Sequence, residues 1–131
     1  MAEEAGVDSI KSYRDLRVWQ NGMELAALAY RFTRILPAAE RFGLVTQIQR
    51  AAASVPANIA EGYGRESKGS YAQFLKTSRG SVYELETHIL LSAKVGHCTQ
   101  EECREILAQS ATISRALSNL IRSVEASGGP S

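Results

Sequence analysis

The chain has 131 residues, of which 44% are hydrophobic and 22% are charged, and its formal net charge is +1. This is the length of one ordinary domain, with enough apolar residues to form a core without metal ions or disulfide bonds. The weak charge excludes the strongly basic composition of a dedicated nucleic-acid-binding domain, although residues 11–98 carry twelve Lys and Arg against seven Asp and Glu.

The sequence contains no recognisable targeting signal and no cysteine motif. No apolar run follows Met1, and no run reaches the roughly 18 apolar residues of a membrane span, so we expect a cytoplasmic protein without membrane contact. Cys98 and Cys103 are five residues apart and form no Cys-x-x-Cys motif. They therefore predict neither a structural zinc site nor, in a reducing compartment, a disulfide bond.

Apolar residues recur at spacings of three and four in four segments, which predicts helices over residues 16–35, 44–61, 70–94 and 99–125. In the first segment Asp15 is the expected N-cap. Its predicted buried stripe consists of Leu16, Trp19, Met23, Ala26, Ala27 and Tyr30. Pro37 is expected to end this helix.

The remaining three helices have equally regular stripes. The second stripe consists of Leu44, Ile48, Ala51, Ala52, Val55 and Ile59; the third of Phe74, Leu75, Ser78, Val82, Leu85 and Ile89; the fourth of Ile106, Ile113, Leu117, Leu120 and Val124. Gly62 and Gly96 are expected to end the second and third helices, Gly62 in a left-handed conformation. Thr99 and Glu102 predict a capping box before the fourth.

Long helices with short connections favour antiparallel neighbours. We therefore predict an all-α fold, an antiparallel up-down-up-down four-helix bundle. The expected bundle domain spans residues 13–126, between flexible tails at 1–12 and 127–131.

The second helix carries two unusual features. Pro56 lies in its interior, where it removes a backbone hydrogen bond, and the bend can either curve the helix around its core or shape an interface. The polar residues that share one face at spacings of three and four are Gln47, Arg50, Ser54, Asn58 and Glu61. Three interpretations of this stripe are open: a solvated face, a polar network between helices or subunits, and a ligand site. In the network, Arg50 would pair with Glu84, Glu86 or another subunit's Glu61.

Cations near the second connection are candidate nucleic-acid contacts. The segment from Gly62 to Ser70 combines glycines, hydroxyls and two cations at a helix start, all of which suit a phosphate group, although a plain turn explains the same residues. The segment lacks the spacing of a Walker loop. Exposed cations on the third helix extend the set, which comprises Arg65, Lys68, Lys76 and Arg79.

The chain offers little for catalysis. His88 and His97 have no nearby triad partner, no metal-binding spacing, and no Glu three residues before them as di-iron bundles require. We therefore expect a protein that is not an enzyme and has no catalytic residues, no metal, no cofactor and no small-molecule substrate.

Several separated motifs together resemble the bacterial four-helix bundle family encoded in intervening sequences of 23S ribosomal RNA genes. The motifs cover about residues 13–97 and occur in the family's order. They are Tyr13-Arg14-Asp15-Leu16, Val18-Trp19-Gln20, Gly43-Leu44 with Gln47 and Arg50, the run from Ser54 to Gly62, Phe74-Leu75, Arg79-Gly80-Ser81 and Glu84-Leu85-Glu86-Thr87.

The resemblance implies a four-helix bundle that assembles as a homopentameric ring and has no established enzymatic activity. The chain is similar also to the accessory variability protein of diversity-generating retroelements, which partners a reverse transcriptase and binds nucleic acid through a basic surface. By position, the resemblance implies structural and interface roles for Arg50, Ser54, Asn58, Glu61, Gly62, Arg79 and Glu84. The weak positive charge of this chain means that the resemblance favours the fold more than nucleic-acid binding.

Three functional hypotheses follow. The first is a homo-oligomeric, pentameric interaction protein whose partner is RNA or a ribonucleoprotein. The alternative is a protein-docking scaffold or accessory subunit, for example of a reverse transcriptase, that uses exposed apolar residues such as Trp19 and Phe42. The third is an enzyme that binds a phosphate ligand at residues 62–70, and here we expect no nucleotide to bind.

Overall fold

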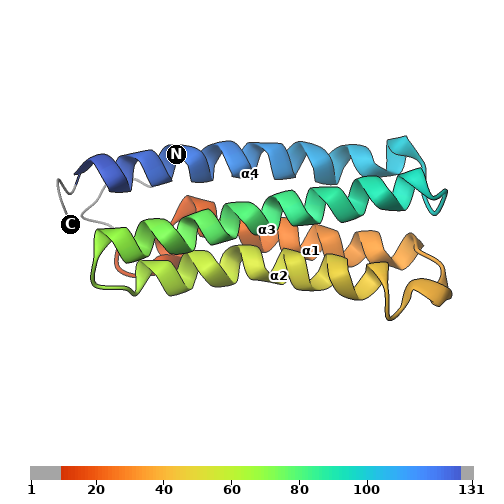
Figure 1. The fold of residues 1–131 in the computed structure, drawn as a ribbon, viewed down its shortest axis with the longest axis horizontal. Helices are drawn as coiled ribbons and strands as arrows, with labels where there is room; N and C mark the ends of the chain where they lie inside the picture. The colour runs from red at the N-terminus through yellow and green to blue at the C-terminus, as the bar shows by residue number, and fades with distance from the viewer. Residues whose placement is uncertain (1–9, 128–131) are drawn as a thin grey trace.

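The computed structural model describes residues 10–127, and every regular element in this stretch is helical. Four long helices lie side by side along a common axis (Figure 1). They are α1 (Arg17–Phe32), α2 (Leu44–Tyr63), α3 (Lys68–Lys94) and α4 (Gln100–Ser127). The prediction of an all-α fold with four helices is confirmed. Of the tails predicted at residues 1–12 and 127–131, residues 1–9 and 128–131 lie outside the described residues, whereas Ser12 caps a short 3-10 helix and Ser127 belongs to α4.

Short 3-10 helices account for the differences at the helix boundaries. One, Tyr13–Asp15, precedes α1, and two, Thr33–Ile35 and Ala38–Glu40, lie between α1 and α2. The predicted first helix therefore ends in a tighter turn just before Pro37, as expected for a residue that cannot continue a helix.

Helices α2 and α3 run antiparallel in close contact. Gly62 near the end of α2 packs against Phe74 near the start of α3, and Ser54 Oγ lies 2.7 Å from Ser81 Oγ about two turns further along. The stripe predicted for α2 is buried in full, and most of the stripes predicted for α3 and α4 are buried as well. These faces form one core with α1.

The buried face of α1 differs from the predicted one. Met23 and Tyr30 are 46% and 47% exposed, so their predicted burial is wrong. The residues buried in their place are Val18, Gly22, Leu25, Ala29 and Phe32. The prediction favoured large side chains, but Gly22 and Ala29 are small enough to bring α1 close to its neighbours. A Cβ atom on Gly22 would lie 3.5 Å from Pro56 Cβ of α2.

Gly62 also has a different role from the predicted one. Helix α2 continues to Tyr63, and among the described glycines only Gly96, just after α3, has a positive φ, of 88°. The left-handed ending expected at Gly62 is therefore wrong, while the end of the third helix expected at Gly96 is confirmed. A Cβ atom on Gly62 would lie 2.7 Å from Phe74 Cβ, so the position requires glycine because α2 and α3 approach so closely.

The helix starts show one confirmed cap and one error. The capping box is present, since the Thr99 N–H donates to Glu102 Oε1 at 2.9 Å and the Glu102 N–H donates to Thr99 Oγ1 at 3.1 Å. Asp15 does not cap α1, whose N-cap is Leu16. Because Asp15 belongs to the preceding 3-10 helix, its carboxylate accepts the Ser12 N–H instead, at 3.2 Å.

One side-chain contact connects the two loops at the end of the bundle that is opposite Gly62. Glu40 Oε2 lies 2.9 Å from His97 Nε2, and Glu40 Oε1 accepts the Leu44 N–H at the start of α2 at 3.1 Å. The hydrogen bond from Leu44, followed by the contact with His97, lowers the pKa of Glu40 below its usual 4.5. Glu40 thus couples the first helical turn of α2 to the turn between α3 and α4.

We predict that Gly62→Ala destabilises the protein by about 1–3 kcal/mol, because the added methyl group overlaps Phe74 and the close contact must open. The free energy of unfolding from urea titrations measures this. Gly80→Ala is the matched control, since nothing lies within 4 Å of a Cβ there. This second change should stabilise α3 by about 0.5–1 kcal/mol. Equal effects at both positions would contradict the close-contact role of Gly62.

We also predict that acid weakens the link between the two loops. A carboxylate whose pKa is lowered on folding stabilises the folded state above the unfolded pKa, and this contribution disappears as the pH falls through the folded pKa. The difference in unfolding free energy between wild type and Glu40→Gln should therefore shrink as the pH drops below 4.5. His97→Gln removes one of the two stabilising contacts, so the same comparison in that background should show a weaker pH dependence. A difference unchanged in acid would contradict this role.

Candidate functional site

The predicted polar stripe of α2 forms a hydrogen-bonded network with α3 at its centre. Asn58 Nδ2 donates to the carbonyl oxygen and to Oγ of Ser54, at 2.9 and 2.8 Å. Ser54 Oγ lies 2.7 Å from Ser81 Oγ, which donates to the Thr77 carbonyl oxygen at 3.2 Å. Because the proton of Ser81 is directed to Thr77, Ser54 is the donor to Ser81. These four residues, which we call the polar seam, form a chain of hydrogen bonds with a single direction.

Arg50 is exposed beside this seam and has no partner. It makes no ion pair or hydrogen bond with any residue from 10 to 127, so a pair with Glu84 or Glu86 within the chain is absent. Glu84 Oε2 instead lies 3.7 Å from His88 Nε2 on its own helix. Glu86 is partly buried, and this burial raises its pKa.

The contact between the helices places Arg50 and Glu84 on one surface. The bond between Ser54 and Ser81 fixes the register of α2 against α3. Arg50 lies one turn before Ser54, and Glu84 lies about one turn after Ser81, so both extend the seam in the same direction. Gln47, one further turn along α2, is exposed as well. This surface therefore carries a positive and a negative side chain that form no ion pair with each other.

Pro56 faces the inside of the bundle. It is buried, and its Cβ lies next to Gly22 of α1. On the other side of this turn, the fully buried Ser78 donates its hydroxyl proton to the Val55 carbonyl oxygen at 2.8 Å. Of the two roles considered for Pro56, packing around the core is the one that these contacts support.

Two of the four candidate nucleic-acid contacts have carboxylate partners. Arg65 Nη2 lies 2.6 Å from Glu61 Oε2, and the guanidinium carbon of Arg65 is 4.6 Å from the centre of the Phe74 ring. Lys76 Nζ of α3 lies 2.7 Å from Glu125 Oε2 of α4. Their charges are therefore largely compensated, although the ion pairs themselves add little stability at such exposed positions.

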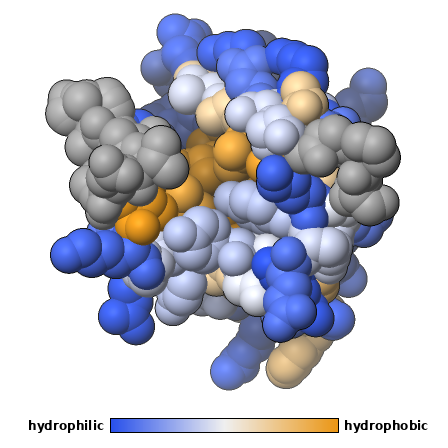
Figure 2. All heavy atoms as spheres, turned by 90° about the vertical axis from the view of Figure 1, so that its left-hand side faces the viewer, coloured by the Kyte–Doolittle hydropathy of each residue, from blue (hydrophilic) through white to orange (hydrophobic). Residues whose placement is uncertain are grey.

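The other two candidates keep an uncompensated charge. Arg79 Nη1 donates to Ser118 Oγ of α4 at 3.1 Å, but no carboxylate of the described chain contacts it. Lys68, in the first turn of α3, is exposed and has no partner within residues 10–127. Lys68 and Arg65 belong to the end of the bundle seen in Figure 2, where hydrophilic side chains surround an apolar hollow.

The opposite end of the bundle carries a group of exposed apolar residues that the sequence analysis largely missed. Five large apolar side chains are exposed in the two loops there and in the last turns of α3: Ile35, Phe42, Leu90, Leu91 and Val95. Phe42, which was expected as a docking residue, is 88% exposed. Trp19, the other expected docking residue, is instead half buried, and its ring stacks edge-on against Tyr13 at 5.2 Å.

Several cationic side chains lie at the same end of the bundle as these apolar residues. Arg31, Arg34 and Lys94 are exposed, and no carboxylate of the described residues contacts them. Arg41 lies over the Phe42 ring, with its guanidinium carbon 5.5 Å from the ring centre. The sequence did not indicate these cations as a group, because they are scattered along the chain and meet only where the helices end.

The described residues do not form a metal centre. Residues 10–127 contain no group of three or more His, Cys, Asp and Glu side chains that could hold a metal ion. None of the helices within that range is long and apolar enough to cross a membrane.

Comparison with known proteins identifies the family. Residues 14–119 match the family described as 23S rRNA-intervening sequence protein. The chain belongs to this family. The match confirms the resemblance found in the motifs and extends it over most of α4. No curated protein matches this family member.

A solved structure shares the fold of this 23S rRNA-intervening sequence protein. It is a protein of unknown function from the S23 ribosomal protein family of Bacteroides thetaiotaomicron. The two chains are 24% identical, with a TM-score of 0.71, over 79% of this chain and 97% of the other.

Proposed function

We propose that this 23S rRNA-intervening sequence protein is a non-enzymatic, self-assembling interaction protein of the cytoplasm. Each subunit is an up-down-up-down bundle, and the subunits form a homopentameric ring that binds RNA or a ribonucleoprotein. It needs no cofactor, no small-molecule substrate and no membrane. The single observation that carries the assembly is that Arg50, on the same surface as Glu84, has no partner within residues 10–127.

The charges on this surface suit a contact between copies. A ring uses a head-to-tail interface, in which two different patches of the same chain meet. Here α2 supplies one patch, with Arg50, and α3 supplies the other, with Glu84. Arg50 of one subunit can pair with Glu84 of the next, while Gln47 adds a hydrogen-bonding group beside them. A charge-assisted pair at such an interface selects the partner and fixes its register.

A charge exchange tests this interface. Arg50→Glu and Glu84→Arg each place like charges opposite one another, so we expect both variants to sediment as smaller species than wild type at micromolar concentration. The double variant Arg50→Glu/Glu84→Arg restores the attraction, and we expect it to recover the wild-type mass. Analytical ultracentrifugation and native mass spectrometry give the masses.

Arg115→Glu is the matched control for the charge exchange. Arg115 is exposed on α4 and has no partner among the described residues, and the substitution changes the charge by the same amount. It should leave the mass of the assembly unchanged. A monomeric wild type, or a double variant that fails to reassemble, would rule out this interface.

The RNA part of the proposal depends on the cations at the Gly62 end. Lys68 and Arg79 carry charge without a carboxylate partner, and the Arg65 guanidinium is already oriented by Glu61 and Phe74. A ring repeats these cations around one axis, which turns a weak bias per subunit into a strong local field. Cations of this kind bind the phosphate backbone rather than read bases.

Fluorescence anisotropy with a structured RNA tests this contact. We expect the affinity of wild type to fall by roughly tenfold or more between low and moderate salt, as counterion release requires. Neutralising Arg65, Lys68, Lys76 and Arg79 to Gln should abolish that binding. Neutralising Arg31, Arg34, Arg41 and Lys94 removes the same charge from the opposite end and should retain it.

Two outcomes of this titration would change the proposal. Loss of binding only in the second variant would move the contact to the apolar end. Absence of wild-type binding at low salt would exclude RNA and leave the protein-docking accessory subunit as the function. The observation that favours this second candidate is the exposed group of Ile35, Phe42, Leu90, Leu91 and Val95, since grouped apolar residues on a surface mark interaction sites.

A further inference from the structure

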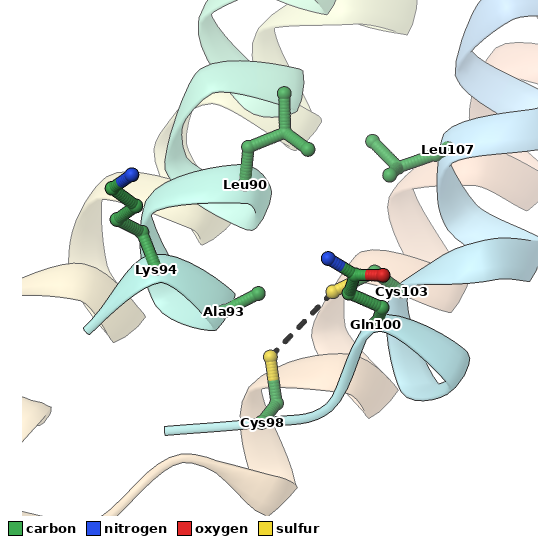
Figure 3. A pocket seen from close by; sticks show the side chains of 7 residues that line it. All are labelled: Leu90, Ala93, Lys94, Cys98, Gln100, Cys103 and Leu107. Atoms are coloured by element: carbon green, nitrogen blue, oxygen red, sulfur yellow. Dashed lines mark hydrogen bonds between the residues drawn. The ribbon is translucent and has the colours of Figure 1, made fainter. Parts of the chain in front are cut away.

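The turn between α3 and α4 contains a cavity of about 470 Å³ that both cysteines line. Its other walls are mostly apolar and come from the last turns of α3 and the first turns of α4, namely Leu90, Ala93, Lys94, Gln100 and Leu107. Figure 3 shows that the thiols of Cys98 and Cys103 point toward each other at the edge of this space. The cavity places two nucleophilic groups beside room for a small molecule.

The two sulfur atoms are in van der Waals contact. Cys98 Sγ lies 3.5 Å from Cys103 Sγ, and a disulfide bond of about 2.05 Å requires them to move together by roughly 1.5 Å. No other side chain has to leave, because the thiols already contact each other. The Cys-x-x-Cys motif does not identify this pair, because the turn between the helices, and not the motif's spacing, brings the two thiols together.

The backbone holds both thiols in this arrangement. Gly96 adopts its left-handed conformation, and the His97 N–H donates to the Ser92 carbonyl oxygen at 2.9 Å, which fixes the course of the chain into Cys98. The capping box at Thr99 fixes the first turn of α4, which carries Cys103. The dithiol is therefore positioned before any reaction takes place.

The two thiols differ in access. Cys98 is half buried in the turn, whereas Cys103 is only 2% exposed and its Sγ faces the Ile89 carbonyl oxygen at 3.9 Å. A reagent in solvent therefore reaches Cys98 far more readily than Cys103. Attack therefore begins at Cys98, and Cys103 can react only with a group already bound there.

We propose that Cys98 and Cys103 form a reversible thiol-disulfide exchange site whose oxidant is a low-molecular-weight disulfide such as oxidised glutathione. The Cys98 thiol loses its proton, and the thiolate attacks one sulfur of the disulfide, which releases one glutathione thiol. Cys103 then loses its proton and attacks Cys98 Sγ, which releases the second glutathione thiol. Two cysteine thiols are oxidised to one disulfide while one glutathione disulfide is reduced to two thiols.

The site is slow rather than hyper-reactive. Burial, followed by the hydrogen bond with Cys103, raises the pKa of Cys98 to about 12. Little thiolate is therefore present at neutral pH, and the exchange rate should rise steadily as the pH increases toward that value. The neighbouring cavity has room for the glutathionyl group of the intermediate.

The test is incubation of the folded full-length protein with oxidised glutathione, followed by alkylation and intact mass measurement. Wild type should lose both free thiols and the mass of two hydrogen atoms, without addition of glutathione. Cys103→Ser cannot complete the second step, so it should keep one glutathionyl group on Cys98. Cys98→Ser should remain unmodified while folded, because Cys103 is shielded.

Unfolding provides the control for shielding. In concentrated urea, Cys98→Ser and Cys103→Ser should take up glutathione at similar rates, which would show that the folded structure causes the difference. Wild type that keeps both thiols, or that forms disulfides only between chains, overturns the proposal. Equal glutathionylation of the two folded variants overturns it as well. The readout is independent of whether the protein assembles or binds RNA.

Discussion

The close contact between α2 and α3 is the constraint on which the rest of the molecule depends. Gly62 has no room for a side chain beside Phe74, and the serines along the interface are small enough to hydrogen-bond across it. A contact made of small residues fixes one register, because a shift by a single residue would bring larger side chains together. That register decides which polar groups of the two helices meet and which remain on the surface.

Much of the fold could be predicted from the sequence, since helix periodicity and helix-end signals act locally. The stripe of α2, the capping box at Thr99 and the turn at Gly96 were all predictable from neighbouring residues. The buried face of α1 was not. Gly22 and Ala29 are buried because another helix needs their small size, and a scale that rewards large apolar residues assigns the core to Met23 and Tyr30 instead.

The candidate site was less predictable, because a surface depends on which charges are paired. Sequence spacing identified Arg65 and Lys76 as cations but could not show that Glu61 and Glu125 contact them. It likewise could not show that Arg50, beside Glu84, has no partner among the described residues. The apolar end escaped notice because Ile35, Phe42 and Val95 belong to segments far apart in sequence that meet only where the helices end.

The single direction of the polar seam gives this surface a chemical preference. Asn58 commits both of its amide protons to Ser54, and no described residue donates a proton to its side-chain oxygen. The hydrogen-bond network therefore ends at the Asn58 side-chain oxygen, which is an acceptor. The hydroxyl protons of Ser54 and Ser81 are already donated within the network. A group that meets the Asn58 side-chain oxygen must bring a proton of its own, so an amide, hydroxyl or guanidinium group suits this position.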